Sequence, residues 1–265
     1  MKKIAILGGG NIGLSLAKGL VNAKKFQQDE IILTRRNTIA LEKIKQSGFE
    51  VTSDNYEAVK DAKIIVLSVL PQQLDILLNE LKNHIRSEQL IISVVSGVTI
   101  SDIENHFEKK LNIVRAMPNT AIAINQSMTC IASNNSNKEQ LELAQSLFDS
   151  VGKTAIIKEE LMTSATALCA CGIAFFLRAI RAASQGGVEI GFHADEALKM
   201  AMQTALGAAG LLLNGAHPES EIDKVTSPRG CTIAGLNEME HEGFSSAMIT
   251  GIKTASARAD GLYKK

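Results

Sequence analysis

The sequence predicts an α/β chain in which a doubly wound, mostly parallel sheet is followed by an all-α domain. Three observations support this fold class. Short, nearly continuous apolar runs alternate with helical patterns through the first half of the chain, as expected when helices cover both faces of a parallel sheet. A glycine cluster directly follows the first apolar run. In the second half, β-branched runs nearly disappear, and long stretches rich in Ala, Leu and Ile replace them.

The expected strands are short β-branched segments, at residues 4–7, 31–34, 64–69, 91–95 and 113–115, with a last strand at 153–157. Between them, apolar residues at helical spacing predict helices over residues 12–23, 38–46, 72–83 and 100–107. Such alternation is typical of a doubly wound sheet. We place the domain boundary after residue 159, so that residues 1–159 form the α/β domain and residues 160–265 the helical domain.

The second half predicts long helices over residues 161–191, 194–213 and 245–263, the last with the Ser245–Ser246 pair as a candidate N-cap. The first of these would be ~45 Å long at 1.5 Å per residue. Because it is apolar on nearly every side, other protein must cover it. Its longest uncharged apolar stretch, residues 165–177, is shorter than the roughly 20 residues that cross a bilayer. We therefore expect a homodimer and no membrane span.

Composition and charge argue against several other classes of function. Basic and acidic residues balance at 28 each and Trp is absent, so neither nucleic acid nor an anionic membrane surface is an expected partner. The four cysteines, Cys130, Cys169, Cys171 and Cys231, contain no C-x-x-C pair, and no histidine lies at zinc-finger spacing from them. We expect no metal site, and reduced thiols in a cytoplasmic protein.

The glycine cluster fits the G-x-G-x-x-G pattern, and it lies between a predicted strand and a predicted helix. In a Rossmann-type fold, Gly8 allows the tight turn, Gly10 lets the backbone approach a pyrophosphate, and Gly13 lets the helix pack close to the strand. Asn11 and Ile12 begin the helix, whose free N–H groups attract phosphate. The cluster therefore predicts a dinucleotide site.

The end of the second strand indicates which dinucleotide is preferred. An NAD enzyme usually carries Asp or Glu there, to accept hydrogen bonds from the ribose 2′-hydroxyl. This sequence has Thr34, Arg35 and Arg36 instead. Arginine pairs well with a 2′-phosphate. We therefore expect NADPH, with NADH as the alternative cofactor.

Three further segments carry a resemblance to a known family. They read Ser-Val-Val-Ser-Gly-Val-Thr-Ile at 93–100, Val-Arg-Ala-Met-Pro-Asn-Thr at 114–120, and Asp-Lys-Val-Thr-Ser-Pro-Arg-Gly-Cys-Thr-Ile-Ala-Gly-Leu at 223–236. Together with the glycine cluster, they resemble the motifs of pyrroline-5-carboxylate reductases over essentially the whole chain. The resemblance implies a Rossmann-type domain, an all-α dimerisation domain, and reduction of 1-pyrroline-5-carboxylate to L-proline. It also implies a homodimer, with a ring of dimers as a larger alternative.

The resemblance also identifies candidate site residues. Besides the glycine cluster and the two arginines, we expect cofactor contacts from Asn55, Ser68, Val69, Pro71, Ser96, Gly97, Pro118 and Asn119. Backbone N–H groups around Gly230, Cys231 and Thr232, with the Ser227 hydroxyl, are expected to bind the substrate carboxylate. Ser227 and Thr232 are the candidate catalytic residues. Thr232 would orient a protonated imine or relay a proton from water.

The remaining titratable candidates in the second half are histidines. His193, His217 and His241 lie near predicted helix ends and outside the matched motifs, so we interpret them as caps or surface residues. The run Glu-Met-Glu-His-Glu at 238–242 is interpreted as a solvated helix face rather than a metal site.

Three departures from the family pattern leave other functions open. Leu70 stands where the family usually has Lys, Ile173 replaces a Pro, and Arg229 replaces a Gly. One alternative is a β-hydroxyacid or phosphogluconate-type dehydrogenase, but that chemistry commonly uses a Lys on the long helix, and residues 161–191 contain only Arg178 and Arg181 as cations. Another alternative is a non-catalytic NADP-binding redox sensor, because fold alone does not determine function.

Overall fold

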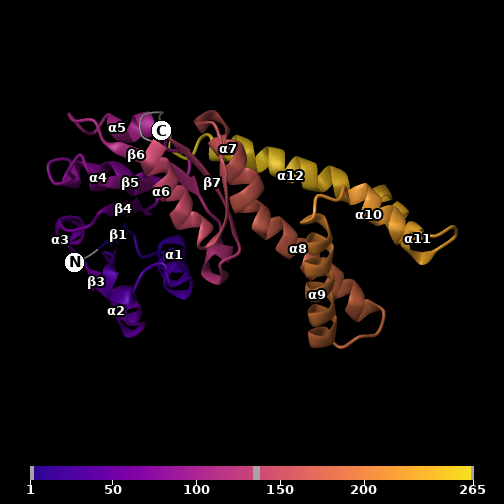
Figure 1. Cartoon of the computed structure of the whole chain (residues 1–265). Coiled ribbons are helices and arrows are strands. Elements are labelled where there is room, and N and C mark those ends of the chain that lie inside the picture. The colour runs from indigo at the N-terminus through magenta and orange to yellow at the C-terminus, as the bar shows by residue number, and fades with distance from the viewer. Residues whose placement is uncertain (1–2, 134–137, 264–265) are drawn as a thin grey trace. The chain divides into compact units, whose positions relative to one another are not determined.

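The computed structural model describes residues 3–133 and 138–263, apart from the side chains of residues 38 and 41 (Figure 1). Two compact units make up the chain, one formed by Met1–Cys171 with Thr254–Lys265 and the other by Gly172–Lys253. The first unit contains the sheet, and the second is helical. The first compact unit thus ends at residue 171 before the chain enters the second. The domain boundary that the sequence indicates after residue 159 remains a prediction.

The sheet of the first unit has eight strands in the order β3-β2-β1-β4-β5-β6-β7-β8. Their bounds are β1 Ile4–Leu7, β2 Ile31–Thr34, β3 Glu50–Thr52, β4 Ile64–Leu67, β5 Leu90–Ser93, β6 Asn112–Met117, β7 Ser127–Ser133 and β8 Gly152–Ile156. Neighbouring strands run parallel except β6 and β7, which are antiparallel. The predicted doubly wound sheet is confirmed. The order reverses at β1, with β2 on one side and β4 on the other.

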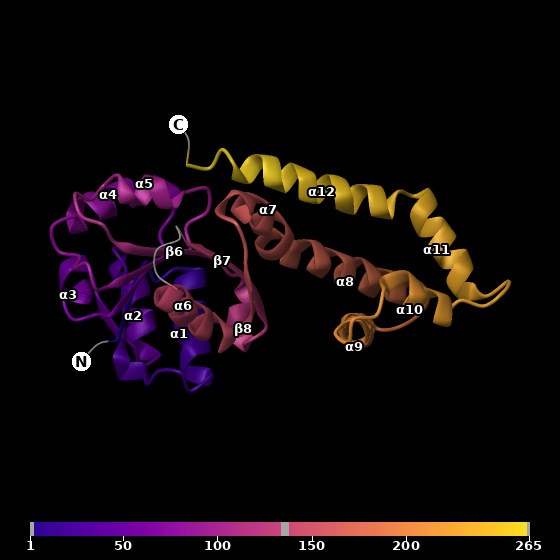
Figure 2. The same cartoon turned by 45° about the horizontal axis from the view of Figure 1, so that its top comes forward.

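Alternate residues of the central strands enter two separate apolar cores, one on each face of the sheet. Ile4 and Ile6 pack with residues of α1 (Asn11–Asn22), α2 (Thr38–Gln46) and α6 (Lys138–Asp149). Ala5 and Leu7 pack on the other face with residues of α3 (Asn55–Val59), α4 (Pro71–Leu81) and α5 (Ile100–Glu104). Figure 2 shows these helices around the sheet. Burial on both faces explains why the central strands β1, β2, β4 and β5 are apolar at nearly every position.

The second unit contains α8 (Gly172–Glu189), α9 (Ala194–Leu212), α10 (Pro218–Lys224), α11 (Cys231–His241) and most of α12 (Phe244–Ala259). Helices α8 and α9 pack against each other, and a Cβ on Gly187 would lie only 2.9 Å from the Cβ of Ala197. Large apolar side chains of this unit are nevertheless exposed, such as Phe176 at 62%, Leu206 at 66% and Leu213 at 87%. The unit therefore presents apolar surface that its own residues do not cover.

Two details of the helical half differ from the prediction. The stretch expected as one helix over 161–191 contains α7 (Met162–Ala165), a π-helical turn at Thr166–Cys171 and then α8. The predicted Ser245–Ser246 N-cap is wrong, because α12 begins at Phe244 and the Ser245 hydroxyl donates to Glu240 at 2.6 Å. The local residue types do not predict the π-helical turn, because it contains neither Pro nor Gly.

One helical run within the described part of the chain, Glu159–Glu189, is long and apolar enough to cross a membrane by length and composition. Only 28% of its most apolar window is buried. Core helices of soluble proteins meet the same criterion. The finding therefore indicates an exposed apolar surface, and it does not distinguish burial against protein from burial in lipid.

Candidate functional site

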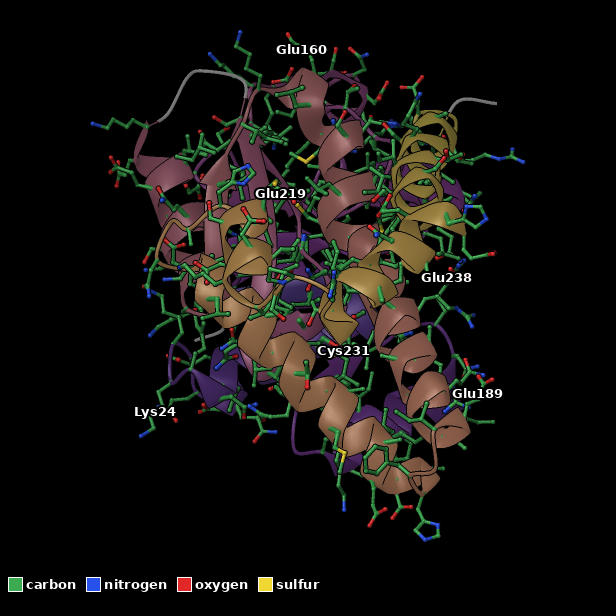
Figure 3. All side chains as sticks on the ribbon, turned by 90° about the vertical axis from the view of Figure 1, so that its right-hand side faces the viewer. Lys24, Glu160, Glu189, Glu219, Cys231 and Glu238 are labelled. Atoms are coloured by element: carbon green, nitrogen blue, oxygen red, sulfur yellow. The ribbon has the colours of Figure 1, made fainter. Side chains whose placement is uncertain are left out.

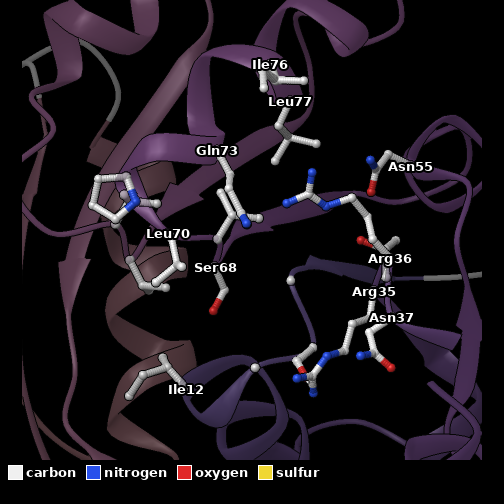
Figure 4. A pocket seen from close by; sticks show the side chains of 18 of the residues that line it. Ile12, Arg35, Arg36, Asn37, Asn55, Ser68, Leu70, Gln73, Ile76 and Leu77 are labelled. Atoms are coloured by element: carbon white, nitrogen blue, oxygen red, sulfur yellow. The ribbon is translucent and has the colours of Figure 1, made fainter. Parts of the chain in front are cut away.

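A cavity of about 700 Å³ opens at the carboxyl ends of β1, β2, β4 and β5, where the strand order reverses (Figure 4). This is the position at which open α/β sheets bind ligands. Its lining residues are Gly8, Gly9, Gly10, Asn11, Ile12, Thr34, Arg35, Arg36, Asn37, Ser53, Asn55, Ser68, Val69, Leu70, Pro71, Gln73, Ile76, Leu77, Glu80, Val94, Val95 and Ser96.

The glycine loop shapes the floor of the cavity. Gly8 has φ +111°, and a Cβ there would lie 2.2 Å from the Ser68 carbonyl oxygen. A Cβ on Gly13 would lie 2.2 Å from the Gly8 carbonyl oxygen, so the start of α1 rests directly on the loop. Gly10 differs, because no atom lies within 4 Å of its Cβ position. Gly8 and Gly13 are thus required by packing, and Gly10 leaves open space toward the cavity.

The N-terminus of α1 is available to an anion. Gly10 is the N-cap residue, and it provides no side-chain hydrogen bond to the helix. The first N–H groups of a helix have no partner within the helix, and the helix dipole adds positive potential there. Both features favour a phosphate at this end of the cavity.

The two arginines after β2 have different environments. Arg35 is half-buried and its Nη1 donates to the Gly9 carbonyl oxygen at 2.8 Å, so it also holds the glycine loop. Arg36 is exposed and lines the cavity. Figure 4 shows both guanidinium groups on the same wall as Asn55. Asn37, the next residue, accepts a hydrogen bond from Ala40 and caps α2.

The opposite wall is largely apolar and comes from the loop after β4 and from α4. Leu70, Pro71, Ile76 and Leu77 contribute to it, and Leu70 is 64% exposed. Such a surface suits the flat rings of a dinucleotide. Gln73 also lines the cavity. Sequence reasoning missed the α4 side chains beyond Pro71, because their positions depend on how α4 packs on the sheet.

Four of the predicted cofactor residues lie outside the cavity lining. They are Gly13, Gly97, Pro118 and Asn119. Gly97 has φ +77°, and a Cβ there would lie 3.1 Å from the Ala259 carbonyl oxygen. The Asn119 side chain accepts from Ala121 N at 3.0 Å and donates to the Cys169 carbonyl oxygen at 3.1 Å. These contacts are structural, and the cofactor roles of the four residues remain predictions.

The Glu159 side chain forms an ion pair with a residue of β6 and a hydrogen bond with the start of α5. Arg115 Nη1 lies 3.1 Å from Glu159 Oε1, which also accepts from Ile100 N at 2.7 Å. Burial lowers the pKa of the Arg115 guanidinium, and the hydrogen bond that Arg115 donates to Glu159 opposes this shift. Glu159 therefore links β6 to the start of α5.

The segment at 223–236 lies in the second unit and forms a turn followed by α11. Gly230 N donates to the Ser227 carbonyl oxygen at 2.9 Å, and a Cβ on Gly230 would lie 2.5 Å from Ser227 Oγ. Cys231 is the first residue of α11 (Figure 3). Thr232 follows it and is half-buried. The Gly230 N-cap provides no side-chain hydrogen bond. Ser227, Gly230, Cys231 and Thr232 therefore meet at one uncapped helix start.

The three histidines of the second unit lie at helix ends, as the sequence indicated. His193 is the N-cap residue of α9, and its N–H donates to Glu196 at 3.3 Å. His217 Nδ1 accepts from Glu219 N at the start of α10, and His241 ends α11. No group of three or more His, Cys, Asp or Glu residues that could hold a metal ion occurs in residues 3–133 and 138–263.

Comparisons with known proteins agree with this geometry. Residues 159–262 match the family described as pyrroline-5-carboxylate reductase dimerisation, and residues 3–97 match NADP oxidoreductase coenzyme F420-dependent. Pyrroline-5-carboxylate reductase 1 of Dictyostelium discoideum is 54% identical over 98% of this chain, although the chain spans only 50% of that relative's length. Pyrroline-5-carboxylate reductase 2 of the same organism is 47% identical over 97% of this chain and 92% of its own length.

A solved structure gives the same result for the fold. The crystal structure of Plasmodium falciparum pyrroline carboxylate reductase with NADP bound is 26% identical, with a TM-score of 0.91 over 99% of this chain and 98% of that chain. The identity, the coverage and the two matched segments lead to one conclusion. This chain belongs to the pyrroline-5-carboxylate reductase family.

Proposed function

We propose that this chain is an NAD(P)H-dependent reductase that converts 1-pyrroline-5-carboxylate to L-proline, with NADPH preferred. The observation that carries the cofactor assignment is the glycine-loop cavity, whose β2 edge has Arg35 and Arg36 and no carboxylate. The family supplies the substrate class. This chain spans 92% of the length of the second Dictyostelium discoideum reductase.

The residues of the cavity fit the cofactor chemically. The uncapped start of α1 would hold the pyrophosphate, and the open space beside Gly10 allows its close approach. Arg36 would pair with the 2′-phosphate, while Arg35 keeps the glycine loop in position. When bound, NADPH supplies the hydride. The protein contributes position and electrostatics.

The start of α11 would hold the substrate. Free N–H groups of Cys231 and Thr232 and the Ser227 hydroxyl can bind a carboxylate without a competing charge. Residues 225–236 contain no Asp, Glu or His that could act as a strong acid. Thr232 would therefore orient an imine that is already protonated, or relay a proton from water.

One sequence feature separates imine reduction from alcohol oxidation. An alcohol substrate needs a base that removes its hydroxyl proton, commonly a lysine on the long helix of related dehydrogenases. Residues 161–191 carry Arg178 and Arg181 and no lysine. An arginine stays protonated and is a poor base. This favours the cyclic imine over a β-hydroxyacid.

The direct test is steady-state oxidation of NADPH with 1-pyrroline-5-carboxylate, beside the reverse assay with an open-chain β-hydroxyacid. Thr232→Ala should lower kcat by about 10–1000-fold, the range for one positioned donor or proton relay. Thr232→Ser keeps the hydroxyl and should retain most activity. Ser227→Ala removes a contact present in ground and transition states, so it should act mainly on KM.

Two outcomes would contradict this assignment. Turnover of the β-hydroxyacid without turnover of the imine would favour the dehydrogenase, and NADPH binding without either turnover would favour the redox sensor. If Thr232→Ala kept the kcat and KM of the unmodified protein, α11 would not be the substrate site.

We also propose a cytoplasmic homodimer formed through the helical half. The matched dimerisation segment, residues 159–262, contains the exposed Phe176, Leu206 and Leu213 and the apolar run Glu159–Glu189. A partner's helices would remove these side chains from water. A ring of dimers is the larger alternative assembly. Light scattering of a detergent-free sample should give at least the mass of a dimer, and a stable, active monomer at micromolar concentration would contradict the proposal.

A further inference from the structure

Two cysteines that are distant in sequence face each other inside the first unit. Cys130 lies on β7 and Cys169 in the π-helical turn Thr166–Cys171, and their Sγ atoms are 3.8 Å apart. Met117 and Met162 belong to the same apolar cluster. A disulfide has an S–S length of about 2.05 Å, so the two sulfurs need to approach by somewhat less than 2 Å.

The two thiols have opposite properties. Cys130 is 5% exposed, whereas Cys169 is half-buried and the more accessible of the two. The hydrogen bond from the Cys130 thiol lowers the pKa of Cys169 to about 7. The same hydrogen bond, together with burial, raises the pKa of Cys130. Cys169 is therefore the accessible sulfur with thiolate character, and Cys130 is the protonated neighbour beside it.

The nearest alternative partner in sequence is unfavourably placed. Cys171 lies two positions after Cys169 in the same helical turn. Side chains two positions apart do not face each other on a helix. Cys130, by contrast, approaches Cys169 from a neighbouring strand.

We propose that Cys130 and Cys169 form a redox modification site, at which a peroxide oxidises the two thiols to a disulfide that joins β7 to the π turn. The Cys169 thiolate attacks one peroxide oxygen, breaks the O–O bond and becomes a sulfenic acid as hydroxide leaves. The Cys130 sulfur then attacks the Cys169 sulfur. An S–S bond forms, the S–O bond breaks, and water leaves with the Cys130 proton. The two sulfurs lose two electrons in total, which reduce the peroxide to water.

The site lies close to a motif of the family. The Cys169 carbonyl oxygen accepts a hydrogen bond from the Asn119 side chain at 3.1 Å, and Met117 accepts one from the Ser96 hydroxyl at 4.0 Å. Ser96 lines the cofactor cavity.

The test uses the full-length protein, reduced and then exposed to hydrogen peroxide. Intact mass spectrometry should record the loss of two hydrogen masses, and non-reducing peptide mapping should identify a peptide that links Cys130 to Cys169. Dithiothreitol should reverse both changes. Cys171→Ser is the matched control and should behave like the unmodified protein.

The variants keep the proposal falsifiable. Cys130→Ser and Cys130→Ala should fold, as judged by circular dichroism, and should give no disulfide, so that Cys169 gains oxygen instead. A link from Cys169 to Cys171, identical products from the Cys130 variants and the unmodified protein, or two thiols that stay reduced would each overturn the proposal. Because the readout is mass, the result does not depend on the proposed enzymatic activity.

Discussion

Gly13 offers the sharpest test of how the glycine loop is built. A methyl group added at this position would lie 2.2 Å from the Gly8 carbonyl oxygen and 3.0 Å from Ile6 Cγ2. An unstrained heavy-atom contact needs roughly 3.5 Å, so α1 and the loop would have to separate by about 1.3 Å. The loop cannot move easily, because Gly8 N and Gly9 N both donate to the Thr34 carbonyl oxygen, at 3.2 and 2.7 Å.

The expected effect of Gly13→Ala is a loss of stability. Overpacking a close-packed interior costs about 1–3 kcal/mol, and the upper part of that range applies because the obstacle is backbone. For a domain of this size each kcal/mol lowers Tm by roughly 2–4 °C. A cost of about 2–3 kcal/mol therefore predicts a fall in Tm of roughly 4–12 °C.

Gly10→Ala is the matched control. Gly10 has φ −81°, and no atom lies within 4 Å of its Cβ position. The substitution should leave Tm nearly unchanged. The methyl group would instead occupy the space through which the backbone approaches the pyrophosphate. We expect NADPH to bind at least about tenfold more weakly, a change of ~1.4 kcal/mol.

The two effects are measured separately. Circular dichroism of the ligand-free proteins gives Tm, and the fluorescence of NADPH itself reports binding in a chain without Trp. Equal Tm for Gly13→Ala and the unmodified protein would refute the packing argument. Normal NADPH affinity of Gly10→Ala would refute the placement of the pyrophosphate.

Two other predictions follow from charged groups. Arg36→Ala should raise the KM for NADPH by about 10–100-fold, the equivalent of one charged hydrogen bond of ~1.5–3 kcal/mol, and should hardly change the KM for NADH. Arg35→Ala should also lower stability, because Arg35 holds Gly9; equal effects of both variants on both cofactors would contradict the assignment. Glu159→Gln should cost about 1–3 kcal/mol in urea unfolding, since it removes the charge to which the buried Arg115 is hydrogen-bonded. Unchanged stability would mean that the pair contributes nothing.

The sequence predicted most strands of the sheet, because a strand that is buried on both faces appears in the sequence as a continuous apolar run. The runs that became β1, β2, β4 and β5 are apolar at nearly every position. β3 and β7 were missed for a physical reason. β3 is a three-residue edge strand that is only partly covered, and β7 reads Ser-Met-Thr-Cys-Ile-Ala-Ser, with polar and apolar residues mixed. Both strands depend on the neighbour that pairs with them.

The candidate site likewise contains residues that the sequence could predict and contacts that it could not. Gly8 and Gly13 were predictable because each has a constraint within the loop, a positive φ at Gly8 and the approach of the Gly8 carbonyl oxygen at Gly13. The contact of Arg35 with Gly9 was not, because it joins segments 26 residues apart. Nor could the sequence reveal the Cys130–Cys169 contact, which depends on β7, a strand that the sequence did not predict.

The last prediction concerns Arg229, which the structure holds at φ +61°, in the left-handed region. The family usually has Gly here, and a non-glycine residue in this region costs roughly 1–2 kcal/mol. Arg229 is exposed and directly precedes Gly230, the N-cap residue of α11, so we predict that its cation contributes to binding of the substrate carboxylate. Arg229→Asn tolerates the same φ and removes the charge, whereas Arg229→Lys keeps both the charge and the strain.

We expect Arg229→Asn to be as stable as the unmodified protein or more so, and to raise the KM for the imine several-fold at nearly constant kcat. Arg229→Lys should keep the KM. This split follows because a cation beside the carboxylate stabilises the ground state and the transition state alike. Steady-state kinetics and urea unfolding of both variants provide the test. If Arg229→Asn gained stability without any change in KM, the charge would have no part in binding, and only the strained turn would distinguish this chain from the family pattern at that position.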